Sequence, residues 1–164
     1  MITIRNATAE DANAWLELRC ALWPEGSLDE HRAEIASFLA GSAREPQAVL
    51  LAEDDDGRIV GFVELSIRPY AEGCSSDRVA FLEGWYVEAE SRRRGIGKAL
   101  VAAAERWGIG QGCTEFASDT QADNEISRAA HGECGFTEVA VIRCFRKELL
   151  PSSLSNVDAV DRNP

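Results

Sequence analysis

The sequence lacks the features of a membrane protein, a secreted protein and a nucleic-acid-binding protein. Its 164 residues contain no apolar run long enough to span a bilayer, and the first residues, MITIRNATAED, lack the apolar core of a signal peptide. The 17 lysines and arginines are outnumbered by 28 aspartates and glutamates, which gives a formal net charge of -11. A nucleic-acid-binding domain needs a basic surface. We therefore expect a protein of the cytoplasm that binds neither membrane nor nucleic acid.

The cysteines do not form the pattern of a disulfide framework or of a metal site. Their number is odd, and no two of them make a CxxC pair. Scattered thiols are typical of a reducing compartment, so we expect no disulfide and no bound metal. A cysteine nucleophile would need a base partner, and the sequence identifies none. The five cysteines are Cys20, Cys74, Cys113, Cys134 and Cys144.

Length and composition indicate one domain followed by a polar tail. A chain of 164 residues suits a single core, and a hydrophobic fraction of 45% is ordinary for a globular protein. We predict one domain over residues 1–149. Residues 150–164 are polar and acidic, which predicts disorder. The acidic charge leaves two interpretations open, because it either serves solubility alone or attracts a polycationic substrate.

The chain begins with a short alternating strand at residues 2–5, and two helices follow it. Thr8-Ala-Glu-Asp11 resembles a capping box and predicts a helix over residues 9–22. Ser27-Leu-Asp-Glu30 is a complete capping box, and the apolar stripe behind it predicts a second helix that ends at Gly41.

The middle of the chain is predicted to be β-structure. Residues 48–53 and 58–68 are apolar runs joined by Asp55-Asp56-Gly57, which is a hairpin turn signal. Residues 79–88, VAFLEGWYVE, predict a third strand. Gly84 lies inside that strand, and a glycine there predicts a bulge or a close backbone approach.

The second half of the chain alternates helices and strands. The pattern predicts helices over residues 95–111 and 124–134, with a short strand at 114–118 between them. Residues 137–142 and 144–149 predict a closing pair of strands. The order β-α-α-β-β-β-α-β-α-β-β indicates an α/β protein with a mixed sheet.

One basic segment interrupts this acidic chain, Arg92–Leu100, RRRGIGKAL. Its glycines lie between a predicted strand and the first turn of a predicted helix, where free N–H groups and the helix dipole favour anions. The spacing is neither a Walker A sequence nor a GxGxxG fingerprint. Two interpretations remain at this point, a cradle for a polyphosphate or a solvated basic turn. The side chains that would add positive charge are Arg92, Arg93, Arg94 and Lys98.

The same turn resembles a family motif. Arg92-x-x-Gly95-x-Gly97 is similar to the Q/R-x-x-G-x-G/A motif of the GCN5-related N-acetyltransferases. The resemblance implies that the turn binds the pyrophosphate of acetyl-coenzyme A. It also implies that family's fold, a mixed, mostly antiparallel sheet flanked by helices, whose splayed central strands form the coenzyme slot. The coenzyme contacts that it implies are Trp85, Tyr86, Val87, Arg92, Arg93, Arg94, Gly95, Ile96, Gly97, Lys98 and Asn124.

Further segments resemble one branch of that family, the aminoglycoside 6'-N-acetyltransferases. They occur in the branch's order and together cover about residues 1–149. The resemblance implies direct transfer of an acetyl group to the 6'-amine of an aminoglycoside, which gives antibiotic resistance. It also implies a homodimer, for which the apolar final strands are the candidate interface. The segments are LWP at 22–24, SIRPYAEGCSSD at 66–77, FLEG at 81–84, RWG at 106–108, ASDT at 117–120 and NEIS at 124–127.

Glu83 and Asp119 are the central candidates for holding the acceptor amine. Glu83 adjoins the predicted bulge and Asp119 follows the next strand, so both are expected at the mouth of the slot. Carboxylates pair with ammonium groups, and one of them could take the proton that the amine must lose before it attacks. The alternatives are an ordinary strand carboxylate for Glu83 and a helix cap for Asp119.

The resemblance implies three more contacts with the substrate. Trp23 and Tyr70 match positions that contact the sugar rings of the drug, although core packing between the first two helices is a competing explanation for Trp23. Related enzymes can carry a substrate-facing glutamate where this chain has Ala140. Glu138 is the candidate that would substitute for it.

Two polar residues near the end of the chain and one near its start complete the predictions. His131 lies where many family members carry a tyrosine that protonates the leaving thiolate, and a histidine could do the same near neutral pH. The alternative for His131 is a buried ring that packs near the coenzyme. Asn124 is either a contact of the coenzyme arm or a helix N-cap. His31, by contrast, is expected to be a solvated helix residue.

Two other functions remain open from the sequence. The same fold and coenzyme could serve a different amine, such as a polyamine, a protein lysine or a protein N-terminus. A non-enzymatic chain could bind the coenzyme without turnover, as a ligand sensor. The intact glycine turn, Asn124 and Glu83 argue against that last function.

Overall fold

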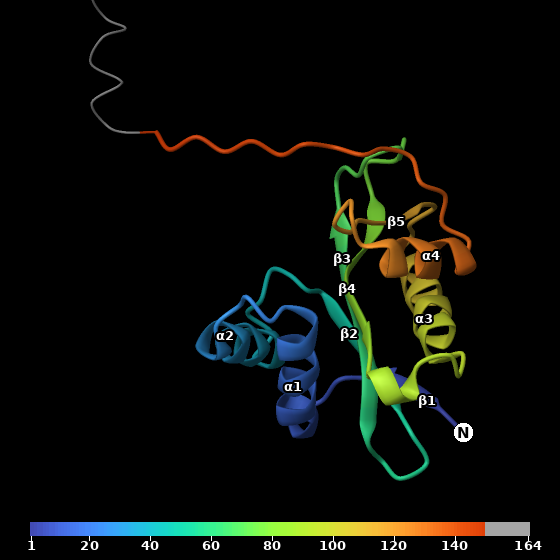
Figure 1. Cartoon of the computed structure of the whole chain (residues 1–164). Helices are drawn as coiled ribbons and strands as arrows, with labels where there is room; N and C mark the ends of the chain where they lie inside the picture. Colours follow the sequence, from blue (N-terminus) through green and yellow to red (C-terminus); the bar gives the residue numbers. More distant parts are fainter. Residues whose placement is uncertain (150–164) are drawn as a thin grey trace, which may run out of the picture.

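A five-stranded sheet forms the centre of the fold in the computed structural model, which describes residues 1–149 (Figure 1). The strands are ordered β1-β2-β3-β4-β5, and neighbours are antiparallel except β4 and β5, which are parallel. The prediction of a mixed, mostly antiparallel sheet is confirmed. The strands are β1 Thr3–Asn6, β2 Ala48–Glu53, β3 Ile59–Arg68, β4 Val79–Val87 and β5 Phe116–Ser118.

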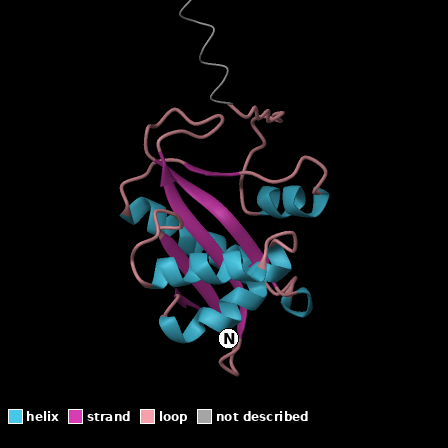
Figure 2. Ribbon diagram, turned by 90° about the vertical axis from the view of Figure 1, so that its left-hand side faces the viewer, coloured by secondary structure: helices cyan, strands magenta, loops and turns pink. Residues whose placement is uncertain are grey.

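Helices cover both faces of this sheet, with α1 and α2 on one face and α3 and α4 on the other (Figures 1 and 2). The predicted capping box at Ser27 is confirmed, because its hydroxyl accepts from the N–H of Glu30 and the Glu30 carboxylate accepts from the N–H of Ser27. Within residues 1–149, no helix is long and apolar enough to cross a membrane. The helical segments are η1 Ala9–Asp11, α1 Ala12–Leu22, α2 Leu28–Leu39, η2 Ala89–Ser91, α3 Ile96–Gly110 and α4 Glu125–Glu133.

Each face of the sheet has its own apolar core. Phe62 of β3 packs in the cluster that contains Trp15 of α1, whereas the next residue, Val63, packs in the cluster that contains Leu100 of α3. All four side chains are fully buried. Side chains alternate along a strand, so a strand covered on both faces reads as a continuous apolar run, as β3 does.

The bulge predicted at Gly84 is present in β4. The pairing of β3 with β4 places Glu64 opposite Gly84 and Leu65 opposite Leu82, so Glu83 is the extra residue. A bulge of this kind bends the strand and turns two consecutive residues toward one face. It therefore decides where Glu83 points.

Beyond the bulge, β4 and β5 separate into a fork. Their last paired residues are Leu82 and Ser118, after which β5 ends and β4 continues to Val87. Within the described residues 1–149, the second half of β4 is paired with β3 on one side and has no strand on the other. Backbone groups along that open edge are available to a ligand. This is the splay expected for the coenzyme slot.

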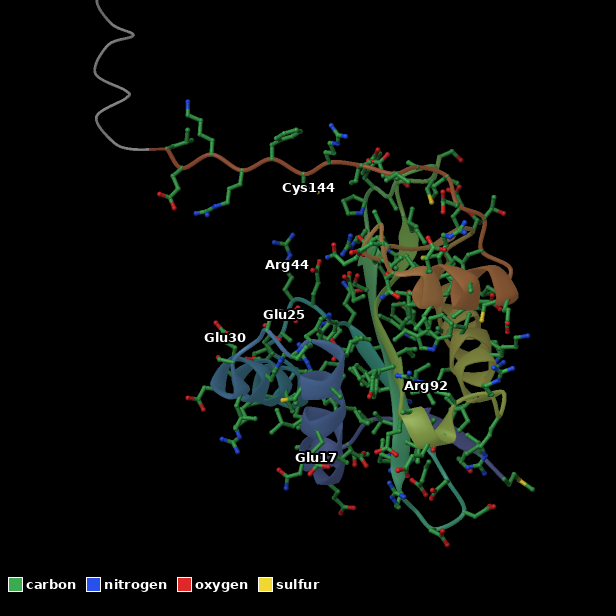
Figure 3. All side chains as sticks on the ribbon, in the orientation of Figure 1. Glu17, Glu25, Glu30, Arg44, Arg92 and Cys144 are labelled. Carbon is green, nitrogen blue, oxygen red and sulfur yellow. The ribbon has the colours of Figure 1, made fainter. Side chains whose placement is uncertain are left out.

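The predicted closing pair of strands is wrong. No strand follows β5 within residues 119–149, and residues 137–149 form an exposed, extended segment that leads away from the sheet (Figure 1). Cys144 lies on its distant part (Figure 3). A strand forms only where a neighbour satisfies its N–H and C=O groups, and this segment has no strand neighbour among residues 1–149. The predicted disorder of residues 150–164 lies outside the described residues.

Candidate active site

The fork between β4 and β5 brings several predicted site residues together. Glu83 and Asp119 directly follow the last paired residues, Leu82 and Ser118, so they start the two diverging branches. Trp85–Val87 continue along the open edge of β4. The fork thus joins the predicted acceptor residues to the predicted coenzyme residues.

Two residues of β3 hold Glu83 in place. Its carboxylate accepts hydrogen bonds from the hydroxyl of Ser66 and from the guanidinium of Arg68, whose Nε lies 2.9 Å from Oε1. The guanidinium also lies over the ring of Phe81, 3.5 Å from its centroid. The Glu83 side chain keeps 20% of its surface exposed. A carboxylate offers about four acceptor sites, so an ammonium group can bind it while Arg68 stays in place.

Asp119 is exposed and is not a helix cap. The N-cap of α4 is Asn124, whose side-chain oxygen accepts from the N–H of Ser127 at 3.0 Å. The capping alternative is therefore wrong for Asp119 and confirmed for Asn124. The exposed carboxylate of Asp119 has no hydrogen-bond or ion-pair partner among residues 1–149, so it can meet a ligand at the end of β5. The amide nitrogen of Asn124 is not used by the cap.

Trp23 forms a wall on the acceptor side of the fork. A Cβ placed on Gly84 would lie 2.6 Å from its indole ring, so only glycine fits below it. Phe62 meets the ring edge-on at 6.3 Å, and His31 stacks beside it at 6.4 Å. His31 is buried, with Nε2 3.2 Å from the carbonyl of Trp23, so the prediction of a solvated residue is wrong. The packing predicted as the alternative for Trp23 is thus present.

A buried ion pair lies beneath Trp23, and the sequence analysis missed it. Glu64 is 3% exposed and accepts from the indole N–H of Trp15 at 2.9 Å. Arg19 Nε lies 3.4 Å from the same carboxylate, and its guanidinium lies 5.1 Å from the Trp23 ring centroid. Burial raises the pKa of Glu64 to about 7, and Arg19 and Trp15 oppose that rise. The available signal was a glutamate within the apolar run of β3.

The start of α3 has the backbone of an anion site. Gly95 is its N-cap with φ of +80°, and no side chain of residues 1–149 caps the helix, so the N–H groups of the first turn are available. Gly97 is required for a different reason, since a Cβ there would lie 2.9 Å from the ring of Trp85. A turn that merely exposed its charges to solvent would need neither feature.

In the described part of the chain, two basic side chains of this turn have a partner and the other two are exposed. Arg92 donates from Nε to the carbonyl of Val87 at 2.9 Å and so clamps the turn onto the end of β4 (Figure 3). The Lys98 ammonium lies 3.5 Å from the carboxylate of Glu133 in α4. The two arginines between them, Arg93 and Arg94, are exposed. Cations around free N–H groups at a helix N-terminus suit a polyphosphate.

An unsatisfied donor marks the path from this turn to the fork. The buried indole N–H of Trp85 has no acceptor among residues 1–149. Leaving a buried donor unpaired costs about 1–3 kcal/mol. The ring sits on the open branch of β4 and packs against Gly97, so a ligand that follows this edge could supply the acceptor. Acetyl-coenzyme A, with amide carbonyls along its arm and a pyrophosphate at its end, fits these residues.

His131 of α4 reaches across to the end of β5. Its Nε2 lies 2.9 Å from the hydroxyl oxygen of Ser118, and its Nδ1 lies 2.8 Å from the carbonyl of Ser127. The ring meets Trp85 edge-on at 5.3 Å and Phe136 at 5.1 Å. The half-buried ring therefore combines the packing that was the alternative for His131 with a polar contact at the fork.

Two predicted substrate contacts are tied to other residues. Tyr70 is 63% exposed in the β3–β4 loop, and its hydrogen bond to Glu72 raises the pKa of the phenol. Glu138 is exposed, 3.9 Å from Arg128 of α4. Neither makes a hydrogen bond or an ion pair with Glu83 in the described part of the chain.

The two thiols that line the cavity beside β5 are poor nucleophiles. Burial raises the pKa of Cys134 and of Cys74, which keeps both thiols protonated. Among residues 1–149, no group of three histidine, cysteine or acidic side chains is placed to bind a metal ion. The arrangement suits direct attack of a bound amine on a bound acyl donor.

Known proteins are similar in sequence to this chain over almost its whole length. Residues 12–136 match the model of the acetyltransferase (GNAT) family. The chain is 58% identical over 146 residues to an aminoglycoside N(6')-acetyltransferase type 1 from Klebsiella aerogenes, covering 89% of this chain and 96% of that one. It is 43% identical over 152 residues to a protein of the same name from Stenotrophomonas maltophilia, covering 92% and 96%.

Solved structures share the fold. The complex of AAC(6')-Iy with the bisubstrate analog CoA-S-monomethyl-acetylneamine superposes with a TM-score of 0.84 at 39% identity, covering 91% of this chain and 99% of that one. Apo AAC(6')-IG from Acinetobacter haemolyticus gives 0.82 at 38% identity, covering 90% and 99%. The predicted fold is therefore confirmed. Because the family model matches residues 12–136 and the relative from Klebsiella aerogenes is 58% identical over nearly its whole length, this chain belongs to the acetyltransferase (GNAT) family.

Proposed function

We propose that this chain transfers the acetyl group of acetyl-coenzyme A to the 6'-amine of aminoglycoside antibiotics. The similar proteins bear this activity in their names, and one solved relative holds a CoA–acetylneamine analog. The observation on this chain that carries the proposal is the fork after Leu82 and Ser118, with Glu83 anchored at its mouth. Acetylation removes a positive charge from the drug, which weakens its contact with RNA and gives resistance. We place the reaction in the cytoplasm, where acetyl-coenzyme A is available.

The chain's own groups account for the main steps of the transfer. The open edge of β4 and the first turn of α3 hold the donor, whose thioester supplies the activated acetyl group. Glu83 and Asp119 bind the ammonium groups of the acceptor. The attacking amine must be neutral although its pKa is about 10 in water, so one of these carboxylates takes the proton, directly or through a water molecule. The amine then attacks the thioester without a covalent enzyme intermediate.

The reaction is tested by thiol release from acetyl-coenzyme A with two matched drugs. One is a kanamycin-type aminoglycoside with a free 6'-amine, and the other carries a 6'-hydroxyl in its place. We expect release with the first drug and none with the second. Release with spermidine or a basic peptide in preference to both drugs would contradict the proposal and favour a different amine acceptor.

Glu83→Gln tests the acceptor site. The amide keeps the shape and the hydrogen bond from Ser66 but loses the charge that holds an ammonium group. A charged hydrogen bond is worth about 1.5–3 kcal/mol, so we expect kcat/KM for the aminoglycoside to fall about 10- to 100-fold. Affinity for acetyl-coenzyme A, measured by calorimetry, should stay unchanged. Glu17→Gln, on the exposed surface of α1 (Figure 3), is the matched control and should behave as wild type.

We also infer that two copies of this chain form a homodimer by exchanging their C-terminal segments. The final segment, residues 140–149, is extended and exposes apolar side chains, Val141, Ile142, Phe145 and Leu149 among them. The outer edge of β5 has no strand neighbour in the described chain, and a cavity of about 320 Å³ borders it. A strand added to an open edge satisfies both sets of backbone groups. The segment of a second copy has the length and the character to fill this place.

The dimer is tested by light scattering coupled to gel filtration. Wild type should elute with twice the mass of one chain at micromolar concentration. Phe145→Asp places a charge in the exchanged segment, and we expect it to shift the mass to that of a monomer. Cys144→Ser, a neighbouring polar substitution of similar size, is the control. A wild type that is monomeric at all concentrations would rule out the exchange.

A further inference from the structure

We propose that Ser118 is a catalytic residue, whose hydroxyl contacts the leaving sulfur and hands it a proton drawn from His131. The inference rests on the proposed acetyl transfer and deepens it. Ser118 is the last residue of β5 that pairs with β4, so it stands at the point where the two strands open. A group in that place borders the path of the acyl donor along β4.

A chain of hydrogen bonds runs through Ser118. Its hydroxyl oxygen lies 2.9 Å from Nε2 of His131 and 3.3 Å from the carbonyl oxygen of Leu82. Nδ1 of His131 lies 2.8 Å from the carbonyl oxygen of Ser127 and 3.3 Å from the hydroxyl oxygen of the same residue. The shorter contact is to the carbonyl oxygen, which only accepts, so Nδ1 carries a hydrogen. The proton that can move is consequently the one on Nε2, which faces Ser118.

The same heavy atoms satisfy both charge states of His131. When the ring is an imidazolium, Nε2–H donates to Ser118 and the Ser118 hydroxyl donates to the carbonyl of Leu82. When the ring is neutral, the Ser118 hydroxyl turns and donates to Nε2. Proton movement therefore needs rotation of one hydroxyl and no movement of the backbone. Trp85 and Phe136 hold the ring edge-on from two sides, which keeps this alignment.

The acceptor carboxylate and the proton donor lie on opposite faces of the sheet. Glu83 contacts Ser66 and Arg68 of β3. These two residues share a face of the strand with Phe62, which packs in the cluster of Trp15, so Glu83 lies on the face of the sheet covered by α1. Ser118 contacts α4, on the opposite face. An acceptor bound at Glu83 would thus approach the thioester from one face while the proton reaches the sulfur from the other.

The step balances in atoms and charge. The neutral amine forms a bond to the thioester carbon, and the carbon–sulfur bond breaks with its electron pair going to sulfur. The sulfur takes the hydroxyl proton of Ser118, and Ser118 recovers a proton from Nε2 of the His131 imidazolium. The proton lost by the amine goes to the carboxylate of Glu83 or Asp119, directly or through a water molecule. Neutral His131 is then reprotonated from solvent. The products are the acetamide and free coenzyme A.

The test compares Ser118→Ala, Ser118→Thr and His131→Gln in steady-state kinetics, with affinity for coenzyme A and the thermal midpoint measured in parallel. Loss of a general acid costs about 100-fold, so we expect Ser118→Ala to lower kcat by about that factor with affinity for coenzyme A unchanged. Ser118→Thr keeps the hydroxyl and should retain most of the rate. Ser42→Ala, which removes an exposed hydroxyl that bonds the carbonyl of Ser37, is the control.

The double variant and the histidine spectrum separate a relay from a packing role. Two members of one relay act as a unit, so Ser118→Ala with His131→Gln should be no slower than the slower single variant. Nitrogen NMR of His131 should show hydrogen on Nδ1, with the Nε2 signal shifted in Ser118→Ala. The inference would be overturned if Ser118→Ala kept the kcat of the wild type, or if Ser118→Ala and Ser118→Thr lost the same factor in kcat. It would also be overturned if the two single losses multiplied in the double variant, or if neutral His131 carried its hydrogen on Nε2 alone. Absence of turnover in the wild type would instead defeat the proposed function and this step together.

Discussion

Glu64 shows how one buried residue can couple stability to pH. Burial raises its pKa from 4.5 to about 7, because the charged form loses its water. The folded protein therefore binds this proton more tightly than the unfolded chain does. The contribution of Glu64 to the free energy of unfolding is full below pH 4.5 and is lost as the pH rises through about 7, a difference of about 3 kcal/mol.

Glu64→Gln should remove that loss, since an amide has no proton to release and still accepts from Trp15. We expect the free energy of unfolding of the wild type, measured with urea, to fall between pH 5 and pH 8. That of the variant should stay constant over the same interval. Asp11 affects stability in a different pH range. Arg5 lowers the pKa of its carboxyl, so the contribution of Asp11 to the free energy of unfolding is lost only in acid. Glu17→Gln should follow the wild-type curve. A parallel decline in Glu64→Gln would show that another group is responsible.

The bulge in β4 is the element on which the acceptor side depends. It turns Glu83 toward Arg68 and brings Gly84 under the ring of Trp23. Gly84→Ala would place a methyl group 2.6 Å from that ring, so the ring or the strand must move. Overpacking of this kind costs about 1–3 kcal/mol. We expect a lower thermal midpoint together with a higher KM for the aminoglycoside.

The control for the bulge is Gly110→Ala. Gly110 ends α3, and a Cβ there meets no atom within 4 Å. Alanine favours a helix over glycine by up to about 1 kcal/mol, so this variant should be as stable as the wild type or more stable, with an unchanged KM. If Gly84→Ala behaved like Gly110→Ala, the ring of Trp23 would not be pressed against β4.

The whole molecule carries a net charge of -11, while its proposed acceptor is a polycation. Long-range attraction raises the encounter rate of opposite charges and is screened as the Debye length shrinks. We expect kcat/KM for the aminoglycoside to fall about ten-fold between about 0.02 M and 0.3 M salt. The same series for acetyl-coenzyme A, an anion, should show no such fall. An equal decline for both substrates would mean that salt acts on the protein itself.

Much of the fold could be predicted from the sequence because its signals are local. The capping box at Ser27, the hairpin turn at Gly57 and the glycine turn before α3 each depend on residues within a few positions of one another. The bulge was foreseeable for the same reason, since a glycine inside a strand is itself the signal. The resemblance to the acetyltransferases rests on such short segments and is confirmed by the family match.

Only the tertiary structure decided which partners the polar side chains have and which conformation residues 137–149 adopt. Trp15 and Glu64 are 49 residues apart in sequence, and Ser118 and His131 are 13 apart on different elements, so no local pattern reports either contact. Residues 137–149 have the alternation of strands but remain extended and unpaired, because a strand is defined by a neighbour rather than by its own residues. The sequence by itself determined the elements whose signals are local, from the capped helix α2 to the bulged strand β4 and the helix α3 behind its glycine turn. The packing of those elements determined which charges are buried, which carboxylates are tied, and which hydroxyl faces the fork.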